Sequence, residues 1–214
     1  MSHYTAAQLR NAWKPVMLRL GFRIERSSFV KRCGAVEHSV VFQRRPSSSD
    51  VLVKLFVCVA DPFESDEALR NRVCLHAYLH RDGTHFFSAH WGESELAGSS
   101  AVFEQFGPPF FERFNTIEGL IAMVEAAQAE FKSPETYLRG PLPAPDDPVA
   151  REFLSSLPKR RPAPIPANEE LLALLYWHSG NPARAVQHVR RYLELLPENH
   201  RMKARLAAMT QPLM

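Results

Sequence analysis

The chain has 214 residues, with 26 Lys and Arg against 23 Asp and Glu, a net charge of +3. A hydrophobic content of 45% and a charged content of 23% are ordinary for a folded protein and exclude wholesale disorder. The longest apolar stretch, 51–60, is about half of the roughly 20 residues that a membrane-spanning helix needs.

The cellular location is predicted from the N-terminus and the cysteines. The first residues, MSHYTAAQLRNAW, lack the basic-then-apolar layout of a secretory signal. Cys33, Cys58 and Cys74 form no CxxC pair, and Cys58 lies in an apolar run typical of a buried residue. This usage predicts free thiols in a reducing compartment and no disulfide framework. We therefore expect a cytoplasmic protein.

Proline marks the division of the chain. Nine of its 17 prolines lie between Pro134 and Pro166, where they oppose long helices and central strands. The sequence predicts an α+β domain over 1–132, a linker with one short helix over 133–166, and a helical tail over 167–214.

The predicted domain opens with a helix, because Thr5 and Gln8 form a capping-box pattern before an apolar face. Pro15 lies inside this helix and predicts a kink or two helical pieces, and Gly21 is a suitable end. Strands are then expected within 22–32, at 36–43 and at 51–59. The last is apolar on both alternating faces, which predicts a central strand buried on both sides.

A β-hairpin is predicted around Asp82-Gly83, because glycine accepts the positive φ that a two-residue turn demands. This turn would place Tyr78 opposite Phe87, with Leu75, Ala77 and Leu79 on the core face. The other face would carry aromatic and polar side chains together: Cys74, His76, Tyr78, His80, His85, Phe87 and Trp91. A Phe-rich stretch follows, and then a helix is expected from Ile117 to Phe131.

No motif for nucleophilic or phosphate chemistry is present, since GxSxG, GxxxxGK[ST] and GxGxxG are all absent. The histidines of the hairpin segment suggest a metal site, but His76 and His80 would lie about 13 Å apart on a strand. His80 and His85 could meet across strands, yet two ligands make a poor site. We predict no metal and no cofactor, and leave open a pairing of Cys33 or Cys74 with a histidine.

The segment 168–199 of the tail has the layout of two helices joined by a turn at Gly180-Asn181-Pro182. It resembles one tetratricopeptide (TPR) repeat. The positions that match the repeat signature are Leu172, Ala173, Tyr176, Gly180, Ala185, Val189 and Pro197. Tyr192 and Glu169 depart from the pattern. A single repeat cannot bury its own face, so the tail must pack on the domain or on another protein. The resemblance implies an inner surface at which Trp177 and His178 contact a peptide; packing of Leu171, Leu174 and Trp177 on the domain is the alternative.

The domain also resembles a bacterial domain-of-unknown-function family. The resemblance rests on Leu20-Gly21-Phe22, Phe42-Gln43, the run 51–59 and Trp91. Members of that family look like accessory proteins of toxin or competition gene clusters, which implies a binding role such as immunity.

These observations predict an α+β fold: an antiparallel meander sheet of about five strands flanked by helices, a Pro-rich linker and a TPR-like hairpin. The expected function is non-enzymatic protein binding that neutralises a toxin, as an immunity protein does, without a membrane. The residues expected to bind the partner are His76, Tyr78, His80, His85, Phe87, Trp91, Trp177 and His178.

Two other functions stay open. One is an enzyme or small-ligand protein with a cleft near His76, His80 or Cys74. The other is a nucleic-acid-binding regulator, for which the basic residues form only short scattered clusters such as Lys31-Arg32 and Arg44-Arg45.

Overall fold

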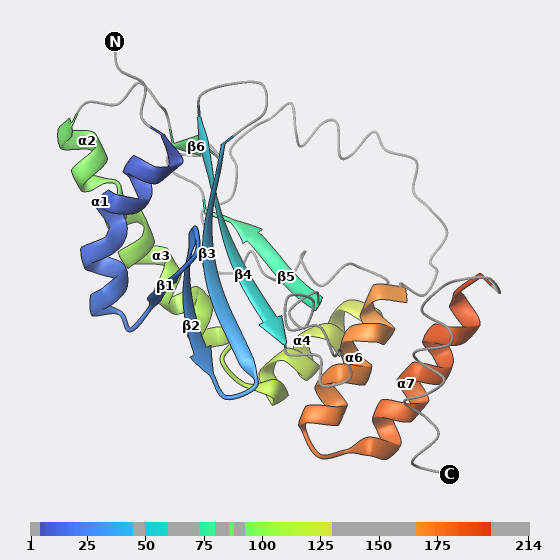
Figure 1. The fold of residues 1–214 in the computed structure, drawn as a ribbon. Coiled ribbons are helices and arrows are strands. Elements are labelled where there is room, and N and C mark those ends of the chain that lie inside the picture. The colour runs from blue at the N-terminus through green and yellow to red at the C-terminus, as the bar shows by residue number, and fades with distance from the viewer. Residues whose placement is uncertain are drawn as a thin grey trace.

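A computed structural model describes residues 5–44, 50–59, 73–79, 86–87, 93–129 and 166–197. Within these ranges the fold is α+β, as predicted: an antiparallel sheet with helices along one face and a helical pair beyond one edge (Figure 1). The predicted linker with its short helix and the last residues of the predicted tail, 198–214, lie outside the described residues.

Helix α1 (Ala6–Arg19) begins at the predicted capping box, in which the Thr5 side chain accepts from the backbone N–H of Gln8. The helix is continuous through Pro15 and does not divide into two pieces. It ends where Gly21 adopts a φ of +83° and the N–H of Phe22 donates to the carbonyl of Met17. The buried stripe of α1 is Leu9, Trp13 and Met17.

The sheet has the strand order β1-β2-β3-β4-β5, with all neighbours antiparallel. Where one strand was expected, the segment 22–32 contains β1 (Arg23–Glu25) and the start of β2 (Ser28–Cys33), separated by a turn at Arg26. β3 (Val36–Arg44) and β4 (Val51–Val59) pair along their full length. β4 is central, but Leu52, Lys54 and Phe56 on its second face are half-exposed, so it is not buried on both sides as expected.

The predicted hairpin register is wrong. β5 (Val73–Tyr78) pairs with β4 from Val59 to Lys54, and β6 (Phe86–Phe87) continues along the same edge of β4, opposite Leu52 and Val51. The two strands therefore run in the same direction and do not pair with each other. Tyr78 lies opposite Lys54, not Phe87, because the free edge of a long central strand offers both segments more backbone hydrogen bonds than a short hairpin would.

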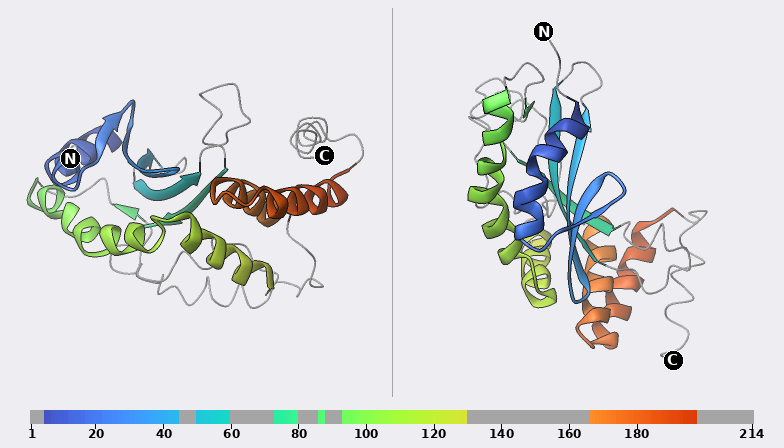
Figure 2. Two further views of the ribbon diagram at one scale, coloured as in Figure 1. Left: turned by 90° about the horizontal axis from the view of Figure 1, so that it is seen from below. Right: turned by 60° about the vertical axis from the view of Figure 1, so that its left-hand side comes forward.

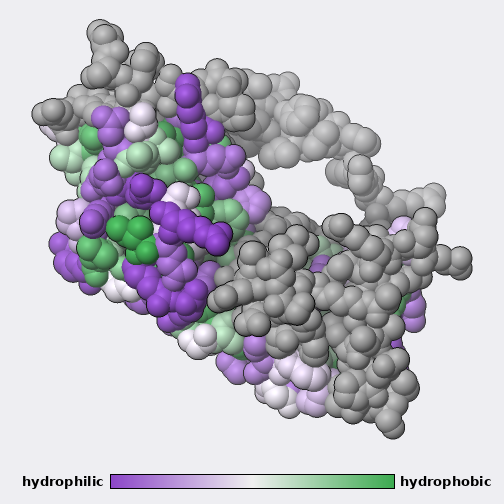
Figure 3. Space-filling model, viewed as in Figure 1, coloured by the Kyte–Doolittle hydropathy of each residue, from purple (hydrophilic) through white to green (hydrophobic). Residues whose placement is uncertain are grey.

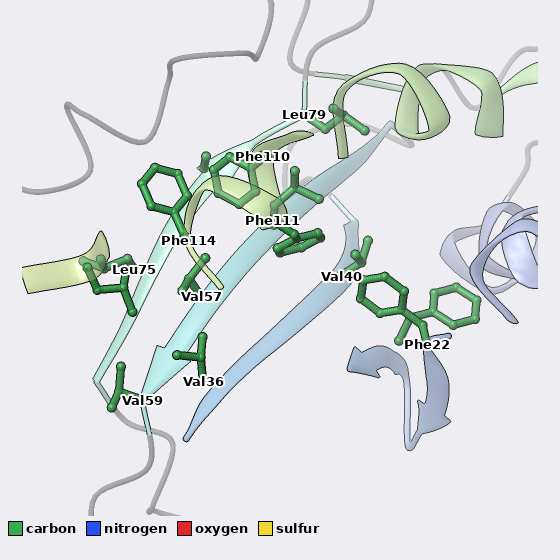
Figure 4. Close-up of a cluster of buried hydrophobic side chains, with 14 of the residues drawn as sticks. Phe22, Val36, Val40, Val57, Val59, Leu75, Leu79, Phe110, Phe111 and Phe114 are labelled. Carbon is green, nitrogen blue, oxygen red and sulfur yellow. The ribbon is translucent and has the colours of Figure 1, made fainter. Parts of the chain in front are cut away.

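The core lies between the sheet and helices α1, α2 (Glu93–Gly98), α3 (Ser100–Arg113) and α4 (Ile117–Ala129). Figure 2 shows α3 and α4 running along one side of the sheet. Phe110, Phe111 and Phe114 meet the strands (Figure 4), and Trp13 donates from Nε1 to Oγ of Ser99 at 2.7 Å. Leu75, Ala77 and Leu79, which the sequence placed on the core face, are buried.

Helix α3 was not expected, because Pro108 and Pro109 lie inside it. Each internal proline costs a helix about 3 kcal/mol. Full burial of a phenylalanine contributes about 1.5–3 kcal/mol, and α3 buries Phe103, Phe110 and Phe111. Tertiary packing therefore outweighs the local helix-breaking effect.

The tail forms the two predicted helices, α6 (Pro166–His178) and α7 (Pro182–Leu195), with Pro182 at the start of α7 and Asn181 as its cap. Both lie beyond the β5 edge, and α6 packs on α4 (Figure 1). Leu171, Leu172 and Leu175 join the main core. Further up α6, Trp177 packs against the same core while remaining partly exposed.

A buried polar network holds α4, α6 and α7 together. Oε2 of Glu169 lies 2.7 Å from Nδ1 of His188, and Oε1 accepts from Nε2 of Gln128 at 2.6 Å. The His188 ring stacks on Tyr176 with the centroids 5.3 Å apart, and Tyr176 donates to Glu125. Glu169, where the TPR pattern favours an apolar residue, is thus the centre of the contact between the helical pair and α4.

Candidate functional site

The sheet has a second face opposite its core face. On it Val41, Lys54, Phe56, His76 and Tyr78 are half-exposed, whereas Val30, Ser39 and Cys58 are buried. Because directly opposed residues of antiparallel strands share a face, the register aligns two rows of side chains across β3, β4 and β5. We call these six residues the outer face: Ser39, Phe56 and His76 in one row, and Val41, Lys54 and Tyr78 in the other. No described helix packs over this face (Figure 2).

The aromatic and basic members of the outer face contact one another. The rings of Phe56 and His76 lie 5.6 Å apart, and those of His76 and Tyr78 lie 5.5 Å apart. Nζ of Lys54 lies 5.4 Å from the centroid of the Tyr78 ring. These contacts hold large side chains in place without burying them, which lowers the entropy lost when a partner covers them.

The predicted partner-binding residues fall into three groups. His76 and Tyr78 lie together on the outer face, as expected from their alternation. Trp177 and His178 lie at the end of α6, on a different element, while Leu171 and Leu174 of the proposed inner surface are buried. The remaining positions lie outside the residues or side chains that the structure describes: His80, His85, Phe87 and Trp91.

The cysteines correct the expectation of free thiols. Cys33 is free, but Cys58 is disulfide-bonded, and the β4–β5 register places Cys74 directly opposite it. Directly opposed strand positions bring Cβ atoms to about 4.5–5.5 Å, a separation that a disulfide can bridge with a small adjustment. Cysteine usage therefore no longer supports a reducing compartment.

Sequence reasoning missed a cavity of about 150 Å³ between the β2–β3 hairpin, the end of α1 and the C-terminal half of α3. Its polar lining comes from Lys31, Cys33 and His38 on the strands and from Glu112 and Asn115 near the end of α3. The apolar lining is Leu20, Phe22, Pro108 and Phe111. Strand alternation places Lys31 and Cys33 on one face with Phe29, but no spacing in the sequence relates them to Glu112 or Asn115.

Two of the polar residues in the cavity already have structural partners. Nζ of Lys31 donates to the carbonyl of Leu20 at 3.0 Å and so caps the end of α1. His38 is 2% exposed, stacks on Phe111 and has Nε2 at 3.2 Å from the carbonyl oxygen of Phe114. A carbonyl only accepts, so Nε2 carries the proton and Nδ1 is the acceptor of the neutral ring.

Electrostatics favour this neutral form. Burial lowers the pKa of His38 below 6.5; the hydrogen bond to Phe114 opposes the shift, and the charge of Lys31 adds to it. The cavity thus brings Cys33 and a neutral histidine to one lining, which is one of the Cys–His pairings left open by the sequence.

Among the described residues, no three His, Cys, Asp or Glu side chains are grouped to hold a metal ion. The same part of the chain contains no helix whose length and apolar character would suit a membrane span. No protein-family model, curated protein or solved structure matches the chain. The resemblances to a TPR repeat and to the bacterial family therefore stay predictions.

Proposed function

We propose that this chain is a non-enzymatic protein-binding module that neutralises a bacterial toxin by covering part of its surface. The observation that supports this role is the outer face. Phe56, His76 and Tyr78 are ordered by mutual contacts, yet remain half-exposed beside a basic residue, Lys54. Aromatic residues of this kind dominate the binding energy of protein interfaces.

The outer face has apolar residues at its centre and a charged pair at its border, as protein interfaces do. Val41 and Phe56 supply apolar area in the middle strands, and Arg32 with Glu37 forms an ion pair toward β2 at 2.8 Å. Charged pairs around an apolar centre set the orientation of a partner more than its affinity.

The experiment starts from full-length tagged protein expressed in its own host. A co-purifying protein is identified by mass spectrometry, purified separately, and its binding measured by calorimetry against the native chain and a Phe56→Ser/Tyr78→Ser variant. Truncation of one hot-spot aromatic costs about 2 kcal/mol or more, so we expect the double variant to lose affinity by at least about 30-fold. Leu195→Ser, on the exposed side of α7, is the control and should bind as the native chain does.

Toxin neutralisation is tested separately by co-expression. The purified partner should arrest growth alone, and the native chain should restore growth while Phe56→Ser/Tyr78→Ser does not. A partner that binds both forms equally would refute the outer face as the site. A partner without toxicity would refute the immunity role while leaving protein binding in place.

The cavity supports a second candidate function, binding of a small molecule. Its volume of about 150 Å³ admits only a few heavy atoms, and Lys31 and Glu112 offer it opposite charges. Native mass spectrometry of protein purified from its host is the test. A bound mass that disappears in Glu112→Ala would favour this function, and ligand-free protein would count against it.

A further inference from the structure

The exposed side of α1 carries a stripe of two basic residues and one apolar residue. Arg10, Lys14 and Leu18 are spaced four apart and therefore lie one above the other on the helix. On one side of the buried stripe of Leu9, Trp13 and Met17 lies Arg19, which forms an ion pair with Glu104 of α3. Arg10, Lys14 and Leu18 lie on the other side of that stripe, away from α3. The stripe therefore faces the β1 edge of the sheet.

β1 and its turn extend this surface. Ile24 lies opposite Phe29 in the register, so its side chain is on the same face of the sheet as α1. Leu18 is 47% exposed and Ile24 is 42% exposed, and they are two of the three exposed large hydrophobic residues in the described part of the chain. Arg26 follows at the turn. We call Arg10, Lys14, Leu18, Ile24 and Arg26 the N-terminal basic surface.

Hydrophilic residues border the apolar centre of this surface. Figure 3 shows apolar residues, in green, bordered by hydrophilic residues, in purple, over α1 and β1. The neighbouring arginines Arg23 and Arg32 form ion pairs with Glu25, whereas Arg10, Lys14 and Arg26 have no acidic partner among the residues that the structure describes.

The N-terminal segment is more positively charged than the chain as a whole. Residues 5–44 contain eight Lys and Arg but only two acidic residues, Glu25 and Glu37, a net of +6. The whole chain has a net charge of +3, so the remainder is acidic. Arg10, Lys14 and Arg26 are three of these eight basic residues and lie on the N-terminal basic surface, where they attract a polyanion.

We propose that the N-terminal basic surface binds the face of an anionic phospholipid bilayer. Such a bilayer offers phosphate groups to Arg10, Lys14 and Arg26, and an apolar layer directly beneath them for Leu18 and Ile24. A nucleic-acid backbone offers the charge but no apolar layer, so it would leave Leu18 and Ile24 in water. The binding is peripheral and reversible, so it requires no membrane-spanning helix.

This inference does not depend on the proposed function, because the outer face lies on other residues. It does revise the sequence-based expectation that no membrane is involved, which rested on the lack of an apolar span.

The test is co-sedimentation of the full chain with vesicles of phosphatidylcholine alone or with about one third phosphatidylglycerol, in 0.1 M salt. The protein should bind only the anionic vesicles, and binding should weaken as salt rises. Each basic residue near such a membrane contributes a factor of about five, so Arg10→Glu/Lys14→Glu should bind at least 25-fold more weakly.

Two further variants complete the design. Arg190→Glu/Arg191→Glu changes the net charge equally on the exposed side of α7 and should bind as the native chain does. Leu18→Ser/Ile24→Ser keeps every charge and should weaken vesicle binding by several-fold, which separates insertion from charge attraction alone. Circular dichroism confirms that each variant is folded.

Three results would overturn the proposal. They are no binding to anionic vesicles in 0.1 M salt, an equal loss in Arg190→Glu/Arg191→Glu, and tighter binding to double-stranded DNA than to vesicles that is unaffected by Leu18→Ser/Ile24→Ser. The last result would assign the same surface to nucleic acid.

Discussion

Replacement of Glu169 by alanine tests whether the helical pair is held by its buried polar network. Glu169 is 3% exposed and serves both Nδ1 of His188 and Nε2 of Gln128. Its removal leaves both groups buried without an acceptor, and Oε1 of Gln128 already has no hydrogen-bond partner among the described residues. A hydrogen bond to a charged group contributes about 1.5–3 kcal/mol, so we expect Glu169→Ala, which removes two such bonds, to lower the free energy of unfolding by about 3 kcal/mol.

Urea unfolding followed by circular dichroism measures this effect. With a slope of about 2 kcal/mol per molar urea, the midpoint should fall by about 1.5 M. Glu194→Ala, on the exposed side of α7, should shift it by less than about 0.3 M. A shift of Glu169→Ala as small as that of the control would show that the network contributes little.

A double-mutant cycle identifies the cause. His188→Phe keeps a ring against Tyr176 but leaves the carboxylate of Glu169 without one of its two donors. The second single variant of the cycle is Glu169→Leu, and Glu169→Leu/His188→Phe replaces both polar partners. The double variant should be more stable than the sum of these two single losses indicates, by at least about 1 kcal/mol. Additive losses would refute the coupling between the two side chains.

Three further predictions concern other parts of the core. The pKa of His38 is lower in the folded than in the unfolded chain, so on acidification the His38 imidazole of the unfolded chain is protonated first. The free energy of unfolding should therefore fall as the pH drops below about 6.5, by up to about 1.4 kcal/mol per pH unit. His38→Gln should reduce this pH dependence in urea unfolding. Gly107→Ala would place a Cβ 2.3 Å from the buried Phe103 ring and should cost about 1–3 kcal/mol in thermal unfolding, whereas Gly98→Ala meets nothing within 4 Å and should be neutral. Burial and Glu170 raise the pKa of Tyr192 to about 12, so an ultraviolet titration should show a late phenolate transition that Tyr192→Phe removes.

Local chemistry made several elements predictable. The capping box of Thr5 and Gln8, the alternation in β3 and β4, and Pro182 at the start of α7 depend on residues close in sequence. Such signals locate helices and strands because the interactions behind them form within one turn or one strand.

The errors arose where distant segments compete for the same partner. Asp82-Gly83 is a good turn dipeptide, but the choice between a hairpin and the free edge of β4 depends on residues about thirty positions away in sequence. Helix α3 was missed because its prolines act locally, while the burial of its phenylalanines depends on the sheet.

The candidate sites show the same division. His76 and Tyr78 share a face because of strand alternation, which is readable from sequence. The cavity was not predictable, since it joins Cys33 and His38 on the strands to Glu112 near the end of α3, and no spacing in the chain relates them.

The interrupted edge strand formed by β5 and β6 has a practical consequence for protein engineering. The N–H of Leu79 still donates to the carbonyl of Val53, and pairing resumes at Phe86 opposite Leu52, so neighbouring rungs of the ladder are separated by six residues of the sequence. The pairing on both sides of these six residues depends on β4 and not on how many residues lie between β5 and β6. A peptide tag or a small reporter domain inserted between positions 79 and 86 should therefore be accommodated without shifting any strand.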